Sequence, residues 1–187
     1  MQNKRLESSL FDKFSTIQWQ SHCEFSWPQV VNQSAVCEQG SMTAYLQQFC
    51  QQIQVEALDN ELRQGSELSS AESDLLQLEN PANASCLLRQ VVLFGDQKPW
   101  LCGYTLIPQD SESSSQVNFA KQGNIPLGRT AFQHQGTERD SLVFALVEHQ
   151  GRQLIARRSR IWVKQTPLLV AEIFLPGSPI YQKDVLK

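Results

Sequence analysis

The fold of this chain is organised by residues 156–181, ARRSRIWVKQTPLLVAEIFLPGSPIY. This stretch predicts two β-strands, residues 156–163 and 168–175, joined by a turn at residues 164–167. Side chains alternate between the two faces of a strand, and both faces of the second strand are apolar except for Glu172. A carboxylate among apolar neighbours is costly to bury, so Glu172 must have a partner, a proton or a task. Glu172 is therefore the first candidate site residue.

A second charged residue, of opposite sign, lies upstream on an otherwise apolar strand face. Residues 86–94 and 100–107 predict a β-hairpin with a turn at residues 95–99, and Arg89 shares its strand face with Leu87, Val91 and Leu93. Two readings stay open, because Arg89 and Glu172 could form a buried salt bridge or Arg89 could bind an anionic ligand. If Arg89 serves a ligand, the fold should tolerate Glu172→Gln.

The other expected elements are an N-terminal amphipathic helix and several short strands and helices. Leu6, Leu10, Phe14 and Ile17 follow helical spacing within residues 1–20, and we expect this helix to cover a sheet edge. Runs of hairpins with a few helices indicate an α+β protein built on one antiparallel sheet. We expect a helix after an N-cap at Ser41, strands at residues 53–57, 139–147 and 154–163, and helical segments at 74–78, 116–123 and 129–133.

Composition narrows the class of protein. The chain has 187 residues, 41% of them hydrophobic and 19% charged, which suits one globular domain over residues 1–187. Its net charge of -3 disfavours a general nucleic-acid binder, and it has no apolar run of the ~20 residues that a membrane span needs. With no signal-peptide pattern at its start, we expect a cytoplasmic protein that neither inserts into membranes nor binds nucleic acid.

Metal chemistry is not expected. The five cysteines are scattered without a C-x-x-C pair, and the three histidines have no metal-ligand spacing. This pattern favours reduced thiols and a site without a metal ion.

Several stretches together resemble the chorismate lyase (chorismate pyruvate-lyase) family. They span about residues 19–181 and occur in the family's order, while residues 56–84 match poorly, and Tyr104 and Gly177 stand where arginine and alanine are common. The matching stretches are SMT (41–43), LRQV (88–91), GDQKPW (95–100), PLG (126–128), RRSR (157–160) and LLVAEIFLPGSPIY (168–181).

The resemblance implies both a fold and a reaction. The family's fold is a single antiparallel sheet of about six strands with helical flaps enclosing a buried ligand. Its members convert chorismate to 4-hydroxybenzoate and pyruvate, the first committed step of ubiquinone biosynthesis, without a cofactor. We expect a monomer that releases product slowly, because a buried aromatic acid held by an arginine should compete with substrate.

The resemblance also carries over the ligand contacts. They fall on Met42, Arg89, Leu127 and Glu172, with Arg89 and Glu172 as the catalytic pair. Arg89 would supply a planar fork for a carboxylate, to which the amides of Met42 and Leu127 could add N–H donors. Glu172 would meet the hydroxyl and ether end of the substrate and assist proton transfer.

Two other functions are alternatives to a lyase. The fold also resembles the effector-binding domain of bacterial transcription regulators, which bind a small molecule without catalysis and carry a winged-helix domain upstream. Only about 20 residues precede the matching region here, and the chain is acidic. A structural protein with a buried Arg–Glu pair would leave the matches at Met42 and Leu127 unexplained. We therefore expect the enzyme.

Overall fold

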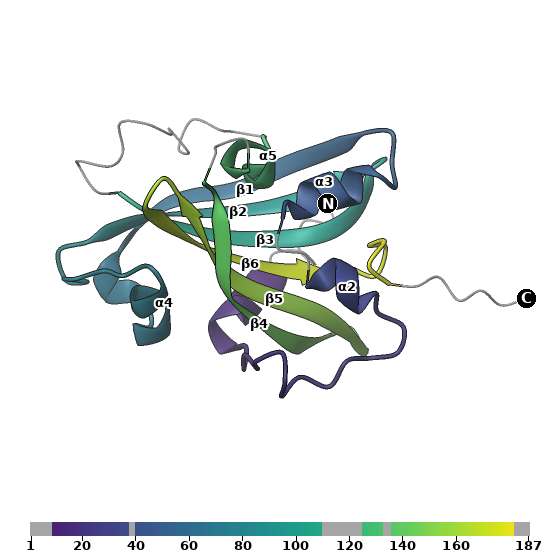
Figure 1. Ribbon diagram of the computed structural model, residues 1–187, viewed down its shortest axis with the longest axis horizontal. Coiled ribbons are helices and arrows are strands. Elements are labelled where there is room, and N and C mark those ends of the chain that lie inside the picture. Colours follow the sequence, from purple (N-terminus) through teal and green to yellow (C-terminus); the bar gives the residue numbers. More distant parts are fainter. Residues whose placement is uncertain (1–8, 38–39, 110–124, 133–135, 182–187) are drawn as a thin grey trace, which may run out of the picture.

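The computed structural model describes residues 9–37, 40–109, 125–132 and 136–181. These residues build an open antiparallel sheet with the strand order β1-β2-β3-β6-β5-β4 and a few short helices, which confirms the predicted α+β class (Figure 1). The strands are β1 Ile53–Gln64, β2 Ser85–Gly95, β3 Lys98–Pro108, β4 Glu138–His149, β5 Arg152–Val163 and β6 Thr166–Phe174. The helical segments are η1 Asp12–Thr16, α2 Gln33–Val36, α3 Met42–Gln47, η2 Gly65–Glu67, α4 Ser70–Leu75 and α5 Leu127–Ala131.

The hairpin turns are shorter than predicted. Asp96 and Gln97 alone connect β2 to β3, and Lys164 and Gln165 alone connect β5 to β6, all four with positive φ between 46° and 81°. Two-residue turns with positive φ at both positions match the right-handed twist of the strands they join. The strands therefore start and end closer to the turns, and the expected four- and five-residue loops are wrong.

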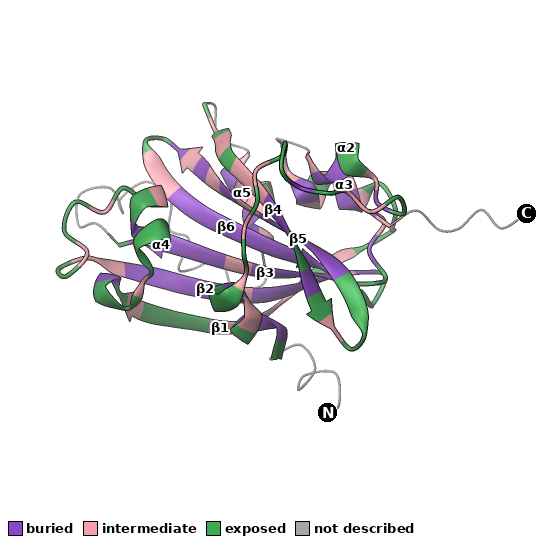
Figure 2. Ribbon diagram, turned by 90° about the horizontal axis from the view of Figure 1, so that it is seen from below, coloured by how far each residue is buried: buried purple, intermediate pink, exposed green. Residues whose placement is uncertain are grey.

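The two faces of the sheet carry separate cores. One face packs against the N-terminal segment, where Leu10 and Phe14 are buried and Ile17 is partly buried. The predicted N-terminal helix is thus confirmed in part, as a short helical segment that ends at Thr16, while Leu6 lies outside the described residues. Figure 2 shows buried residues along the central strands and exposed ones along the edge strand β1.

The helix after residue 65 begins earlier than predicted. Ser69 and Glu72 form a capping box, in which each side chain accepts a hydrogen bond from the other residue's backbone N–H. This box starts α4 at Ser70, so the helical turn expected at residues 74–78 is wrong in its bounds. The helix expected at residues 116–123 lies outside the described residues.

The second face is covered by α2, α3 and α5. Val36 of α2 and Leu46 of α3 are fully buried in one cluster, and Ala131 of α5 is fully buried in a neighbouring cluster. Ser41 caps α3 as predicted, because its Oγ accepts a hydrogen bond from the Ala44 N–H. All of the candidate site residues lie on this covered side.

We predict that Gly95→Ala destabilises the fold. A Cβ at Gly95 would lie 2.1 Å from a ring atom of Trp100, a rigid side chain buried in the same core. Moving that ring should lower the free energy of unfolding by about 1–3 kcal/mol in a urea titration. Gly177→Ala is the matched control, because its Cβ would meet Pro99 O at 3.4 Å, an ordinary contact. Equal midpoints for Gly95→Ala and wild type would contradict this account.

Candidate active site

The sheet register brings Arg89 and Glu172 to one face. Arg89 lies opposite Thr105 on β3, and Thr105 lies opposite Val170 on β6, two residues before Glu172. The two charged residues are therefore two strands apart and displaced by one residue pair. Strand spacing of ~4.8 Å and a rise of ~3.4 Å per residue put their Cα atoms ~12 Å apart. That separation leaves room for a ligand between the two side chains.

One cavity is lined by all four residues carried over from the family. Met42, Arg89, Leu127 and Glu172 surround it together with mostly aliphatic side chains of β1, β2, β3, β5 and β6. The space inside it that is open to the centre of a water-sized sphere is about 50 Å³, so the cavity is narrow. Small-molecule sites in proteins typically combine apolar walls with a few polar groups. The lining of the cavity, with its charged groups among apolar walls, is therefore suited to a small organic ligand with charged ends.

Two short helices close this cavity where they meet at Gly128. A Cβ at Gly128 would lie 2.7 Å from Ser41 Oγ and 3.1 Å from Thr43 Oγ1, so glycine permits the close approach of α5 to the start of α3. Figure 1 shows the two helices on the same side of the sheet. Met42 and Leu127 are the buried first residues of α3 and α5. Backbone N–H groups in a first helical turn have no acceptor within the helix and can serve a ligand.

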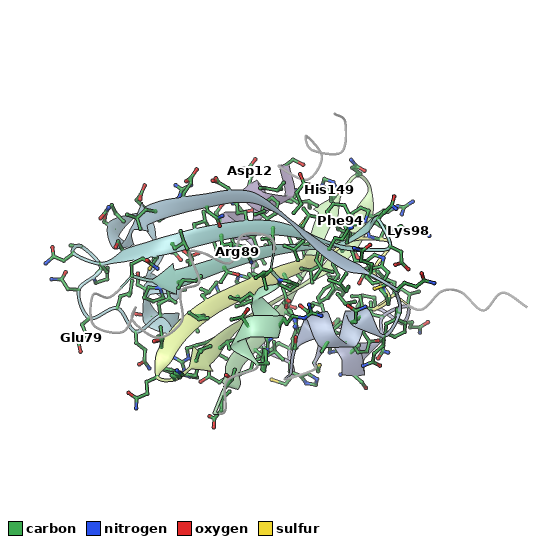
Figure 3. All side chains as sticks on the ribbon, turned by 90° about the horizontal axis from the view of Figure 1, so that it is seen from above. Asp12, Glu79, Arg89, Phe94, Lys98 and His149 are labelled. Atoms are coloured by element: carbon green, nitrogen blue, oxygen red, sulfur yellow. The ribbon has the colours of Figure 1, made fainter. Side chains whose placement is uncertain are left out.

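Arg89 is almost completely buried, with 2% of its surface exposed. Its Nη2 donates a hydrogen bond to the Ile125 carbonyl oxygen at 2.9 Å, just before α5 begins. Burial lowers the pKa of the Arg89 guanidinium, because desolvation disfavours its charged form, yet an arginine stays charged at neutral pH. Figure 3 labels this side chain near the middle of the sheet. The structure thus holds a desolvated positive charge against the cavity and ties it to the covering segment.

Glu172 forms its salt bridge with Arg157 and not with Arg89. Arg157 is fully buried on β5 directly opposite Glu172, and its Nε donates to Glu172 Oε2. Its Nη1 donates to the Val36 carbonyl oxygen at 2.9 Å, and its guanidinium lies 5.8 Å from the centre of the Phe174 ring. The alternative of an Arg89–Glu172 pair is therefore wrong.

Sequence reasoning missed Arg157, because the register that pairs it with Glu172 is set by the length of one turn. The expected turn at residues 164–167 would pair Val163 with Leu168 and place Glu172 opposite Ser159. The observed two-residue turn pairs Val163 with Thr166, which moves the register by one residue pair on the same face and brings Arg157 opposite Glu172. Arg139 of β4 also lines the cavity, and sequence reasoning missed it as well.

The described ranges contain no cluster of metal-binding side chains and no membrane-spanning helix. No group of three or more His, Cys, Asp or Glu side chains there could hold a metal ion. No helix in the same ranges is both long and apolar enough to cross a membrane.

Solved structures of other proteins share the α+β fold of this chain. The effector domain of PhnF from Mycobacterium smegmatis superposes with a TM-score of 0.53 at 11% identity, covering 73% of this chain and 89% of that one. A gene product of Staphylococcus aureus superposes with a TM-score of 0.53 at 10% identity, covering 79% of this chain and 96% of that one. At such low identity these likenesses show the fold alone.

Sequence comparison gives the family. A family model described as chorismate lyase matches residues 13–186. The "probable chorismate pyruvate-lyase" of Vibrio parahaemolyticus is 44% identical over 168 residues, 90% of this chain and 91% of that protein. The "chorismate pyruvate-lyase" of Pectobacterium atrosepticum is 40% identical over 144 residues, 77% and 76% of the two chains. The chain belongs to the chorismate lyase family.

We predict that Glu172→Gln destabilises the protein, in contrast to the tolerance expected from the sequence. Glutamine can still accept one hydrogen bond but leaves the buried Arg157 charge without its counter-ion. The loss should be about 3 kcal/mol, at the low end for breaking a buried pair. In a thermal melt this is a decrease of roughly 6–12 °C for a chain of this size.

The double variant Glu172→Gln/Arg157→Met is the companion measurement. It removes the stranded charge together with its partner and should recover at least part of the lost stability. A Glu172→Gln variant that melts with wild type would show that the pair contributes little to the fold.

Proposed function

We propose that the protein converts chorismate to 4-hydroxybenzoate and pyruvate. The single observation that carries this proposal is the placement of Arg89, Glu172 and the first residues of α3 and α5 around one covered cavity. Membership of the family and the names of the relatives support the same substrate. The alternative of a non-catalytic effector-binding domain rests on a shared fold, which by itself does not decide function.

The reaction asks little covalent chemistry of a protein. The ether bond between ring carbon C3 and the enolpyruvyl oxygen breaks, and a proton leaves ring carbon C4. The ring becomes aromatic, and the enolpyruvate takes up a proton to become pyruvate. Atoms and charge balance without an oxidant or reductant. Aromatisation supplies the driving force, so the protein must supply orientation, exclusion of water and proton movement.

Arg89 is proposed to bind the ring carboxylate. Its planar fork can donate two parallel hydrogen bonds to a carboxylate, and its burial strengthens them because water does not compete. The amides of Met42 and Leu127 would add donors from the two covering helices. A ring held at this end places its C4 oxygen toward the opposite end of the cavity, where Glu172 lies.

Glu172 is proposed to act as the proton acceptor at the hydroxyl and ether end. Its pairing with Arg157 keeps it oriented as an acceptor. In that orientation it can remove a proton from the substrate or accept a hydrogen bond from the ring hydroxyl. Arg157 acts through Glu172 and is a positioning residue in this scheme. It also joins Glu172 to α2 through the Val36 carbonyl, so the acceptor is linked to part of the cover.

The covered cavity has a consequence for turnover. Both ends of the aromatic product would remain bound after pyruvate forms, so we propose that 4-hydroxybenzoate leaves slowly and competes with chorismate. The proposal also includes a cofactor-free, single-domain monomer in the cytoplasm that carries out the first committed step of ubiquinone biosynthesis. These finer points rest on the family resemblance.

Incubation of the pure protein with chorismate tests the proposal directly. We expect 4-hydroxybenzoate and pyruvate in equal amounts, followed by chromatography and a coupled pyruvate assay, at a rate that EDTA does not change. Unchanged chorismate beside a folded protein would exclude the lyase and leave the effector-binding alternative. Loss of activity on chelation would contradict the cofactor-free part alone.

Arg89→Lys tests the two-pronged contact. Lysine keeps the positive charge but cannot present a planar fork, so kcat/KM should fall by about 2–4 kcal/mol, or roughly 30- to 1,000-fold. A melting temperature measured on the same preparation separates this effect from unfolding. Near-normal kinetics would show that positive potential alone suffices at this position.

A further inference from the structure

A second arginine reaches the end of the cavity where Glu172 lies. Arg139 is the second residue of β4, opposite Ile161 on β5, and it lines the cavity with Glu172. Its Nη1 donates to Ser159 Oγ. Ser159 pairs with Val170 and is therefore a diagonal neighbour of Glu172 on the same face, at a Cα distance of ~7–8 Å. The guanidinium thus extends along β5 toward Glu172.

Arg139 also lies where the cover meets the sheet. Its Nη2 donates to the Gly40 carbonyl oxygen at 3.3 Å, one residue before the N-cap of α3. Its Cζ lies 5.7 Å from the centre of the ring of Phe132, the residue that ends α5. Unlike the buried Arg89, Arg139 is partly exposed. It therefore stands at the rim of the cavity on the β4 side and can meet a group that extends out of the central pocket.

The proposed substrate carries such a group. In chorismate one carboxylate is on the ring and the other is on the enolpyruvyl ether at C3, next to the C4 oxygen. If Arg89 holds the ring carboxylate, the enolpyruvyl group lies toward Glu172 and the β4 side. We propose that Arg139 binds the enolpyruvyl carboxylate and thereby makes the site select the two-carboxylate substrate over its one-carboxylate product. This inference rests on the proposed function.

The assignment gives the two arginines different tasks. Arg89 meets a carboxylate that substrate and product share, so it contributes to binding of both. Arg139 meets a carboxylate that leaves with pyruvate, so its contribution ends when the ether bond breaks. A purely structural role for Arg139, as a link between Ser159, Gly40 and Phe132, would affect both ligands equally.

Steady-state kinetics of Arg139→Gln separate these roles. Glutamine retains polar contacts at this position but has no charge for the second carboxylate. We expect KM for chorismate to rise about 10- to 100-fold, the size expected for a charged contact at a partly exposed rim. The inhibition constant of 4-hydroxybenzoate should change less than about threefold. An equal loss for both ligands, or no change in either, would overturn the proposal.

Arg160→Gln is the matched control. Arg160 lies on the adjacent strand β5 and pairs with Asp140, the neighbour of Arg139, but its side chain faces away from the cavity. The same loss of one arginine charge from the β4–β5 pair should leave both constants near wild type. Arg139→Lys, which keeps a charge at the rim, should retain more of the affinity for chorismate than Arg139→Gln. If Arg139→Gln fails to fold, Arg139→Lys carries the comparison of the two constants.

A binding measurement decides the question without turnover. The stable ether 3-(carboxymethoxy)-4-hydroxybenzoate has the ring carboxylate, the C4 hydroxyl and a second carboxylate beside it. In calorimetric titrations, Arg139→Gln should weaken binding of this diacid at least about tenfold relative to 4-hydroxybenzoate. Equal weakening of both ligands, or none, would contradict the inference. Absence of lyase activity in wild type would contradict the proposed function instead.

Discussion

The buried ion pair between Arg157 and Glu172 is the interaction on which the rest of the site depends. It lies on the adjacent interior strands β5 and β6, where the register places the two residues directly opposite each other. A buried ion pair needs further hydrogen bonds to offset its loss of water, and the Val36 carbonyl accepts one such bond from Arg157. The pair therefore links the sheet, the covering helix α2 and the proposed proton acceptor, so that a substitution at either residue affects all three.

The antiparallel register then sets the distance between the charged ends of the cavity. Arg89 stands two strands from Glu172, with Gly103 and Thr105 of β3 lining the space between them. Because Arg89 also donates to the Ile125 carbonyl, its position is coupled to the start of α5. The rigid sheet thus holds the charges, while the short helices that meet at Gly128 close the cavity above them.

Much of this arrangement could be predicted from the sequence, because a charge on an apolar strand face is conspicuous at period two. That pattern identified Glu172 and Arg89, and the hairpin signals predicted the antiparallel sheet. Arg157 was missed because one residue pair of register depends on turn length, which the residues between two strands do not determine. Arg139 was missed because its contacts, Gly40 and Phe132, come from distant parts of the chain. Met42 and Leu127 were identified from the family resemblance alone, because every residue except proline has a backbone amide and no side-chain pattern shows which amide binds a ligand.

The central claim is that a ligand spans the cavity from Arg89 to Glu172. A crystal structure of the protein with 4-hydroxybenzoate tests it most directly. The account predicts carboxylate oxygens within about 3 Å of Arg89 nitrogen atoms and the hydroxyl directed at Glu172. A carboxylate bound to Arg139, a reversed ring with its hydroxyl at Arg89, or a ligand outside the cavity would contradict it.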